Sequence, residues 1–156
     1  MEPQIQDGFF LLQDTCEREK QLHLLPLLKT TPPDIARYLD EISKAADSTI
    51  VTLNRLKGGD DSLDHEPNPL PVVEQQVRTS FTEAAQKKVL FGTKGPDYVR
   101  ALLVDQLQET IYIGNLAKVM SEDDRDADRA DSFRALATKW FGIRDEGYRL
   151  LDETKG

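Results

Sequence analysis

The sequence predicts an all-helical protein, built as an up-and-down bundle of about five helices. Apolar residues recur at intervals of three and four over most of the chain, which is the spacing that places side chains on one face of an α-helix. Proline and glycine divide this pattern into helical segments joined by turns. No segment shows a convincing strand pattern. Helices with broad apolar faces bury those faces most simply by packing as a bundle.

The first helix is predicted over residues 4–29. Its inward face repeats at intervals of four, three and four and carries Leu12, Cys16, Glu19 and His23. Pro26 is expected to break or kink the end of this helix, because proline has no backbone N–H and clashes with the preceding turn. A histidine on an apolar face is either a hydrogen-bonded core residue or a metal ligand, and both interpretations of His23 stay open.

The motif Thr31-Pro32-Pro33-Asp34 is typical of an N-cap followed by the opening turn of a helix. A second helix is therefore predicted from this motif to about Lys57, where Gly58-Gly59 ends it. Its buried stripe consists of Ile35, Leu39, Ile42, Ala46, Ile50 and Leu53. Residues 60–71 contain three prolines and several acids, so we expect an exposed loop there.

Three further helices are predicted over residues 72–90, 97–120 and 131–153. The first of these is expected to turn inward Val73, Val77, Phe81 and Ala84. The second is the most apolar and is expected to lie centrally in the bundle. Residues 121–131 are rich in acids and are predicted to be a turn that leads into the last helix. That helix repeats, with a helical period, Phe133, Ala137, Trp140, Tyr148 and Leu151.

Length and charge exclude several classes of function. A chain of 156 residues is long enough to form a single domain with a continuous core, without disulfides or a structural metal. The formal net charge is −8 and the basic residues are scattered, so we expect no binding to nucleic acid or anionic membranes. Near its start the sequence shows no charged region followed by an apolar run, so we expect no secretion signal, and no stretch approaches the roughly 20 apolar residues of a membrane helix. We therefore expect a soluble, cytoplasmic protein.

The sequence holds no recognised catalytic motif. Its single cysteine, Cys16, excludes an internal disulfide and argues against a cysteine-based zinc site, so we interpret it as a buried apolar residue. The alternating acids at positions 124, 126 and 128 resemble the start of a calcium loop. However, Arg129 stands where that loop needs glycine, and Ala135 where it needs a bidentate acid. No catalytic residue is predicted.

Three carboxylates are informative because they lie on or near predicted buried stripes. Glu19 is interpreted either as a salt-bridged carboxylate or as a functional one. Glu109 interrupts the apolar fourth helix beside Gln106 and Gln108, where a buried charge requires a partner. Asp47 lies off the apolar stripe of the second helix and is expected to face solvent.

Two segments carry a family resemblance. Leu12-Gln13-Asp14-Thr15, followed after three residues by Glu19-Lys20-Gln21-Leu22, is similar to the first-helix signature L-x-D-T and E-K-Q-L of the YciF-type bacterial stress proteins, a branch of the ferritin-like superfamily. The similarity continues to Arg55-Leu56. Residues 109–117, ETIYIGNLA, resemble the family's E-I-A-S-Y-G-T-L-A. The resemblance implies a ferritin-like four-helix bundle with an additional helix, a stress-associated role and a homodimer.

The same resemblance implies a site for two metal ions, for which this sequence supplies an incomplete ligand set. Such a site uses inward carboxylates because oxygen ligands bridge the metals and balance their charge. Glu19 matches the ligand of the first helix. The E-x-x-H pair of the second helix falls on Asp47, with isoleucine in place of the histidine, and the paired glutamates of the fourth fall on Gln106 and Glu109. The acids of the last helix fall near residues 141–143, which contain none.

Two functions remain open. The first is a non-catalytic, stress-associated bundle protein with a degenerate metal site and no cofactor, in which Glu19 and Glu109 are buried polar partners. The second is a reduced metalloprotein with oxidase or peroxide-related activity, in which one iron or manganese ion is held by Glu19, Asp47, Glu109 and, as a further candidate, His23. Convergence of these side chains within about 5 Å would favour the second function, because metal ligands lie near 2 Å from a shared ion.

Overall fold

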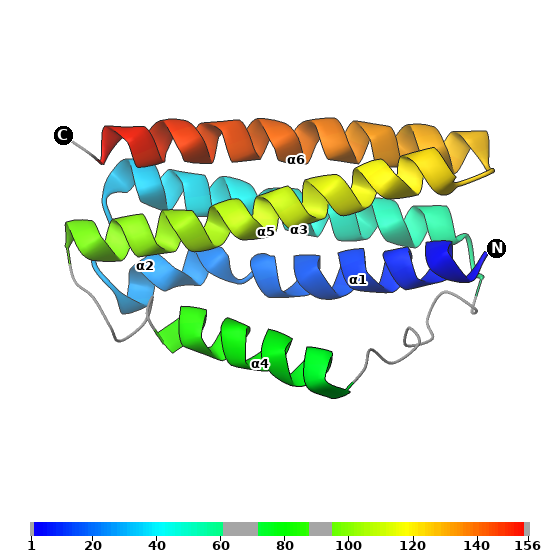
Figure 1. Ribbon diagram of the computed structural model, residues 1–156. Coiled ribbons are helices and arrows are strands. Elements are labelled where there is room, and N and C mark those ends of the chain that lie inside the picture. Colours follow the sequence, from blue (N-terminus) through cyan, green and yellow to red (C-terminus); the bar gives the residue numbers. More distant parts are fainter. Residues whose placement is uncertain (1, 61–71, 88–94, 155–156) are drawn as a thin grey trace.

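The computed structural model describes residues 2–60, 72–87 and 95–154, and every regular element within them is helical (Figure 1). The prediction of an all-helical protein is confirmed. The long helices are α1 (Pro3–Glu19), α3 (Pro33–Lys57), α4 (Val72–Lys87), α5 (Pro96–Asp123) and α6 (Ala127–Glu153). Between α1 and α3 lie a 3₁₀ turn, η1 (Leu22–Leu24), and a short helix, α2 (Leu25–Leu28). No helix in the described ranges is long and apolar enough to span a membrane.

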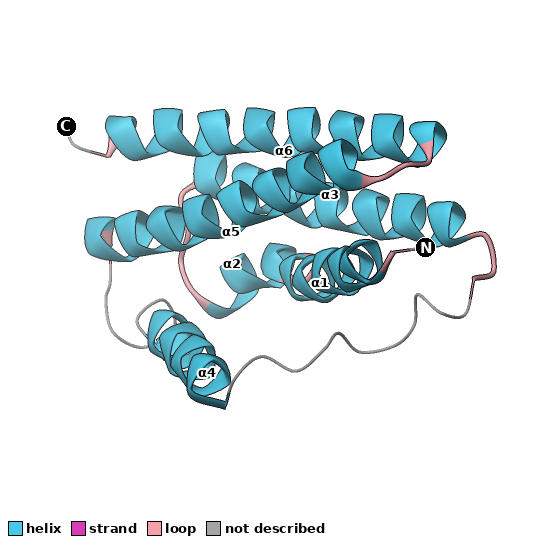
Figure 2. Cartoon of the chain, turned by 45° about the vertical axis from the view of Figure 1, so that its right-hand side comes forward, coloured by secondary structure: helices cyan, strands magenta, loops and turns pink. Residues whose placement is uncertain are grey.

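Four of the long helices form a bundle, and α4 lies outside it. α1 packs against α3 and α5, and α6 packs against the same two helices, so α1 and α6 occupy opposite corners. Figure 1 shows that α3 and α5 run in one direction while α1 and α6 run in the other. Every packed pair is therefore antiparallel. α4 lies below α1, on the side away from α6, and returns along the bundle, so α5 begins at the same end as α3 (Figures 1 and 2).

The first helix is shorter than predicted and ends at Glu19 instead of continuing to residue 29. After Lys20 the chain turns into η1, where the backbone N–H of His23 donates to Ser43 Oγ of α3 at 2.9 Å. Pro26 lies in the first turn of α2, where a helix needs no backbone donor. This change of direction turns the His23 side chain to solvent, so its predicted place on the inward face is wrong.

α3, α5 and α6 correspond closely to predicted helices. α3 ends at Gly58, whose φ of 58° lies in the left-handed region that glycine adopts without strain. α6 begins earlier than predicted because Asp126 caps it, accepting a hydrogen bond from the backbone N–H of Arg129 at 3.0 Å. The predicted acidic turn over residues 121–131 is therefore too long, and only residues 124–126 separate α5 from α6.

The turn between α5 and α6 is held by Asp124. Its buried carboxylate accepts hydrogen bonds from Arg129 Nε and Nη2, each at 2.7 Å, and from the backbone N–H of Asp126 at 3.0 Å. The Arg129 guanidinium and these hydrogen bonds hold the pKa of Asp124 below its usual range, against the opposing effect of burial. Of the alternating acids at positions 124, 126 and 128, Asp124 therefore stabilises the turn and Asp126 caps α6.

The core fills the space between the four bundle helices. Phe9 of α1 and Phe133 of α6 meet edge to face, with ring centres 5.3 Å apart. Trp140 is fully buried, and its Nε1 donates to Thr49 Oγ1 at 3.0 Å, which in turn donates to the carbonyl oxygen of Ala45 at 2.7 Å. Because each of these buried polar atoms has a partner, the group is buried at little cost.

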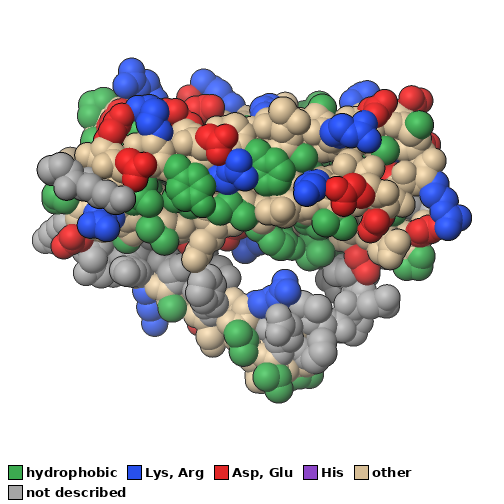
Figure 3. All heavy atoms as spheres, turned by 45° about the horizontal axis from the view of Figure 1, so that its top comes forward, with side chains coloured by type: hydrophobic (Ala, Val, Ile, Leu, Met, Phe, Trp, Pro, Cys, Tyr) green, Lys and Arg blue, Asp and Glu red, His purple; other side chains and the backbone are tan. Residues whose placement is uncertain are grey.

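The surface shown in Figure 3 mixes charges of both signs. On α6, Arg149 forms ion pairs with Glu146 and Glu153, and Arg134 pairs with Asp131. Exposed pairs of this kind contribute at most about 1 kcal/mol each to stability. This face therefore carries no region dominated by one sign of charge.

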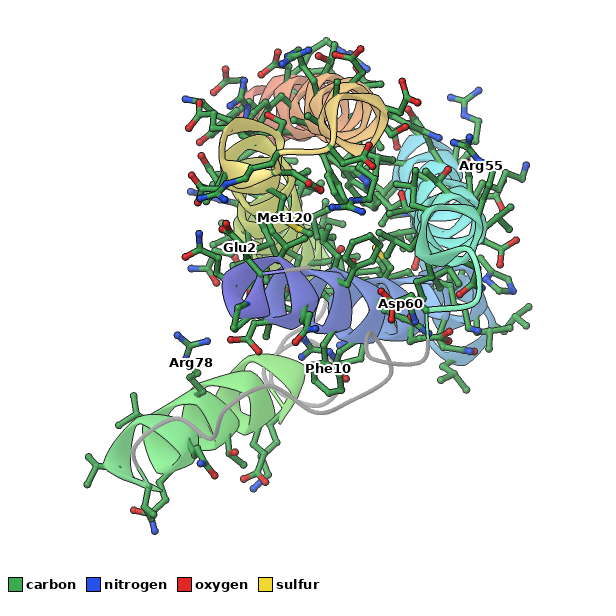
Figure 4. The ribbon with its side chains drawn as sticks, turned by 90° about the vertical axis from the view of Figure 1, so that its right-hand side faces the viewer. Glu2, Phe10, Arg55, Asp60, Arg78 and Met120 are labelled. Atoms are coloured by element: carbon green, nitrogen blue, oxygen red, sulfur yellow. The ribbon has the colours of Figure 1, made fainter. Side chains whose placement is uncertain are left out.

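The valines of α4 are exposed. Val73 and Val77 are 71% and 58% exposed, and Ala84 is also exposed, so the prediction that these residues face inward is wrong. Arg78 lies on another face of α4 and points toward the bundle in Figure 4, and its charge opposes the rise that burial causes in the pKa of Tyr112 on α5.

Three predictions concern parts of the chain outside the described residues. They are the inward position of the Phe81 side chain, the end of the third predicted helix at residues 88–90, and the exposed loop over residues 61–71. Asp60, which opens that predicted loop, is exposed.

Candidate functional site

The most unusual polar group in the bundle interior is the carboxyl group of Glu19. The residue is only 6% exposed, and Oε2 has no hydrogen-bond partner among the described residues. Glu19 is also the last residue of α1, where the helix dipole disfavours negative charge. An ionised carboxylate is therefore costly at this position.

α5 contributes three neighbouring polar side chains, Asp105, Gln106 and Glu109. Gln106 is 1% exposed, and its Nε2 donates to Asp105 Oδ2 at 3.2 Å, while its Oε1 lacks a partner in the described chain. Asp105 and Glu109 are half-buried and lie one helical turn apart. Among the described residues, α1 and α5 thus each contribute a buried acceptor oxygen without a hydrogen-bond partner.

Burial and like charge control the ionisation of these acids. The pKa of Glu19 is raised well above its ordinary value, first by burial and then by the negative charges of Glu109 and Asp105, while Arg18 opposes the rise. Burial also raises the pKa of Glu109, against the influence of Arg18. Burial likewise raises the pKa of Asp105, and the hydrogen bond from Gln106 opposes it. The acids form one electrostatic group in which Glu19 favours its neutral form.

Asp47 and His23 lie on the exterior. Both side chains are exposed, and both line a surface groove of about 470 Å³ beside η1 and α3. His23 Nδ1 is 2.9 Å from the carbonyl oxygen of Lys20. The predicted solvent-facing position of Asp47 is confirmed, whereas His23 does not face Glu19 across the interior.

The four candidate ligands therefore fall into two groups. Glu19 and Glu109 interact between α1 and α5, while Asp47 and His23 face solvent. Across the described ranges, no three His, Cys, Asp or Glu side chains are grouped so that they would hold a metal ion. On α6, where the resemblance would place further acids, Ile143 is buried in the core. The predicted ligands are not assembled as one set.

Cys16 lies one turn before Glu19 on α1. It is fully buried, and burial raises the pKa of its thiol to about 12. A thiol of this kind is rarely ionised near neutral pH and is a poor nucleophile. The interpretation of Cys16 as a buried core residue is confirmed.

Sequence reasoning did not identify Asp105, Tyr112 or Arg18 as neighbours of the buried acids. Asp105, Glu109 and Tyr112 are spaced at intervals of four and three, which places them on one face of α5. This spacing is visible in the sequence and could have identified Asp105 as a neighbour of Glu109. Arg18 offers no such signal, because an arginine next to a buried position is also typical of an ordinary helix surface.

Comparison of the chain with family models, with curated proteins and with solved structures found no match in any of the three. The candidate site consists of the buried Glu19 of α1, whose ionisation is influenced by the half-buried Asp105 and Glu109 of α5.

Proposed function

We propose that this chain is a ferritin-like helical bundle protein with a degenerate metal site and no catalytic activity. The arrangement of helices supports this fold, since α3 and α5 run parallel and are joined by one long connection, as in ferritin-like bundles. The resemblance of residues 12–22 to the YciF-type proteins supports the same fold and a stress-associated role.

The separation of the candidate ligands into two groups carries this proposal. A ferritin-like metal site requires carboxylates and histidines from four helices to point inward at shared ions. Glu19 and Glu109 meet this requirement on α1 and α5, but Asp47 of α3 lies in solvent. Glu19 and Glu109 then serve as buried polar partners between two helices.

A second function, that of a reduced metalloprotein, is favoured by one specific observation. Glu19 Oε2 and Gln106 Oε1 are buried acceptors without partners in the described residues, and a bound cation is one kind of partner for such an oxygen. Oxygen ligands of this kind suit manganese and iron. The metal would supply oxidase or peroxide-related chemistry, while the chain would supply oxygen ligands and limit contact with water. Asp47 and His23 would not be ligands.

Metal content distinguishes these two functions. The wild type, Glu19→Gln and the control variant Asp47→Asn are analysed for metals after aerobic purification and after anaerobic reconstitution with Fe(II). The non-catalytic function predicts no stoichiometric metal in any of the three. Near-stoichiometric iron or manganese in the wild type and in Asp47→Asn, together with its loss in Glu19→Gln, would instead establish the metalloprotein.

We also propose, from the family resemblance, that the protein is a cytoplasmic homodimer. Sedimentation equilibrium is expected to give twice the 17.7 kDa mass of the chain. A monomer at all concentrations would contradict this part of the proposal.

A further inference from the structure

We propose that an open groove between α3 and α6 binds a small organic anion, with the charged group of the ligand at Lys139 and Ser48 and its apolar part over Gly142. The groove has a volume of about 690 Å³, which is within the range of small-molecule sites. None of the four candidate metal ligands lines it, so the inference goes beyond the proposed function and does not depend on it.

The middle of the groove is apolar and open. It is lined by Ala45 of α3 and Ile143 of α6, which are both buried, and by the exposed Gly142 of α6. A Cβ added at Gly142 would meet no atom of a neighbouring element within 4 Å, so the space above this glycine is empty of protein. An apolar group of a ligand could therefore rest on this part of the groove and lose contact with water.

Gly142 differs from other glycines of the helical bundle in having no packing role among the described residues. A Cβ at Gly114 would lie 2.6 Å from Phe141 Cε1, and one at Gly147 would lie 2.5 Å from Tyr38 Oη, so close packing accounts for both. Glycine inside a helix is destabilising relative to alanine. We attribute the glycine at position 142 to the space that a bound ligand requires.

One end of the groove presents hydrogen-bond donors suited to an anion. Lys139 of α6 and Ser48 of α3 are both exposed, and Lys139 Nζ lies 3.4 Å from Ser48 Oγ. In the described part of the chain Lys139 has no carboxylate partner. Lys44, one turn before Ser48, is a further cation, and its ion pair at 2.7 Å neutralises Asp40. Ammonium and hydroxyl groups both donate to carboxylate, sulfonate or phosphate oxygens.

The other end of the groove carries charges that offset each other. Arg37 and Glu41 lie one turn apart on α3 and have opposite signs. The helix rise places Arg37 roughly 16 Å from Ser48, so this pair is distant from the end at Lys139. The net charge of −8 repels anions from a distance, so the local donors must supply the selectivity. We therefore place the anionic group at Lys139 and Ser48.

Titration of the whole chain with two fluorescent probes tests this proposal. Anilinonaphthalene sulfonate combines an anionic group with aromatic rings, and N-phenylnaphthylamine is a related neutral molecule. Lys139→Met is expected to weaken binding of the sulfonate about tenfold, because a charge-assisted hydrogen bond is lost, and to leave the neutral probe unchanged. Gly142→Leu is expected to weaken both probes at least about tenfold, because leucine fills the groove.

Two controls accompany these variants. Lys118→Met removes the same charge from an exposed lysine of α5 outside the groove and should leave both dissociation constants unchanged. Circular dichroism checks that each variant remains helical. If Gly142→Leu does not fold, Gly142→Ala fills less of the same space and takes its place.

The outcomes are distinct. Weaker binding of the sulfonate alone in Lys139→Met, together with weaker binding of both probes in the variant at position 142, supports the site. Unchanged binding in both groove variants overturns it, because the probes would then be bound elsewhere, for example at the exposed Leu27 and Leu28 of α2. An equal loss in Lys118→Met, or a wild-type dissociation constant above about 1 mM for the sulfonate, also overturns it. Metal content is not measured, so the result is independent of the test of the proposed function.

Discussion

Two buried polar regions of this bundle differ in how fully their hydrogen bonds are satisfied. Between α3 and α6, Trp140 donates to Thr49, and Tyr38 Oη donates to the carbonyl oxygen of Ile143 at 2.8 Å. Between α1 and α5, Glu19 and Gln106 each keep an acceptor oxygen without a partner in the described residues. A satisfied group helps to specify packing, whereas an unsatisfied one costs stability. The α1–α5 region is therefore where this fold is not optimised for stability alone.

The largest effect is expected in the satisfied region. Trp140→Ala should lower the free energy of unfolding by about 3–5 kcal/mol, because it empties a large core site and leaves Thr49 without its donor. Urea denaturation followed by circular dichroism measures this loss, since the chain has no other tryptophan to follow by fluorescence. A loss below about 1 kcal/mol would mean that the α3–α6 contact is not part of the stable core.

Close packing in the same region predicts the next effect. A Cβ at position 147 would lie 2.5 Å from Tyr38 Oη and 3.1 Å from Leu107 Cδ2. Gly147→Ala should displace Tyr38 from its hydrogen bond to Ile143 and destabilise the fold by about 1–3 kcal/mol. Addition of Tyr38→Phe, which removes the hydroxyl, should make the alanine less costly. Strictly additive losses in this double-mutant cycle would contradict the assigned contact.

In the unsatisfied region, a substitution should increase stability. The folded-state pKa of Glu19 is raised above its unfolded value near 4.5. The stability contributed by neutral Glu19 is therefore complete below that value and is lost as the pH rises toward the folded-state pKa. Glu19→Gln removes the ionisation, so it should gain about 1–2 kcal/mol over the wild type at pH 8 and little at pH 4. Denaturation curves at the two pH values measure this, and an equal difference at both would contradict it.

The smallest effect is expected at a second glycine of α6, Gly142. A Cβ at position 142 would meet nothing within 4 Å, unlike one at position 147 in the same helix. Gly142→Ala should therefore stabilise the protein by about 0.5–1 kcal/mol, because alanine loses less backbone entropy in a helix. Thermal unfolding should show a higher midpoint. A lower midpoint would indicate that position 142 is in contact with a group outside the described chain.

Whether the sequence correctly predicted the buried residues of a helix depended on whether the apolar stripe of that helix packs against another helix. α3 and α5 follow their apolar stripes, and α3 ends at the predicted glycine, whereas α6 begins at its Asp126 cap, earlier than predicted. α4 also has a periodic apolar stripe, but Val73 and Val77 on that stripe are exposed. Periodicity identifies a helix reliably, whereas it identifies the buried face only when that face has a partner.

The candidate site shows the same limit. Glu19 and Glu109 could be recognised from sequence because each interrupts an apolar stripe, and both lie in the acidic region. His23 could not be placed correctly, because the end of α1 depends on a hydrogen bond to Ser43, a residue 20 positions away. Contacts between residues far apart in the sequence cannot be predicted from local periodicity.

By itself, the sequence determined that this protein is helical, where α3 begins and ends, and that Glu19 lies on a buried stripe. These properties follow from local spacing, from proline and glycine, and from helix caps. Only the tertiary structure decided that α1 stops at Glu19, that the valines of α4 are exposed, and that the candidate ligands divide into an interior and a surface group. Those outcomes depend on which helices meet, because burial and pKa are properties of a side chain's surroundings and not of its position in the chain.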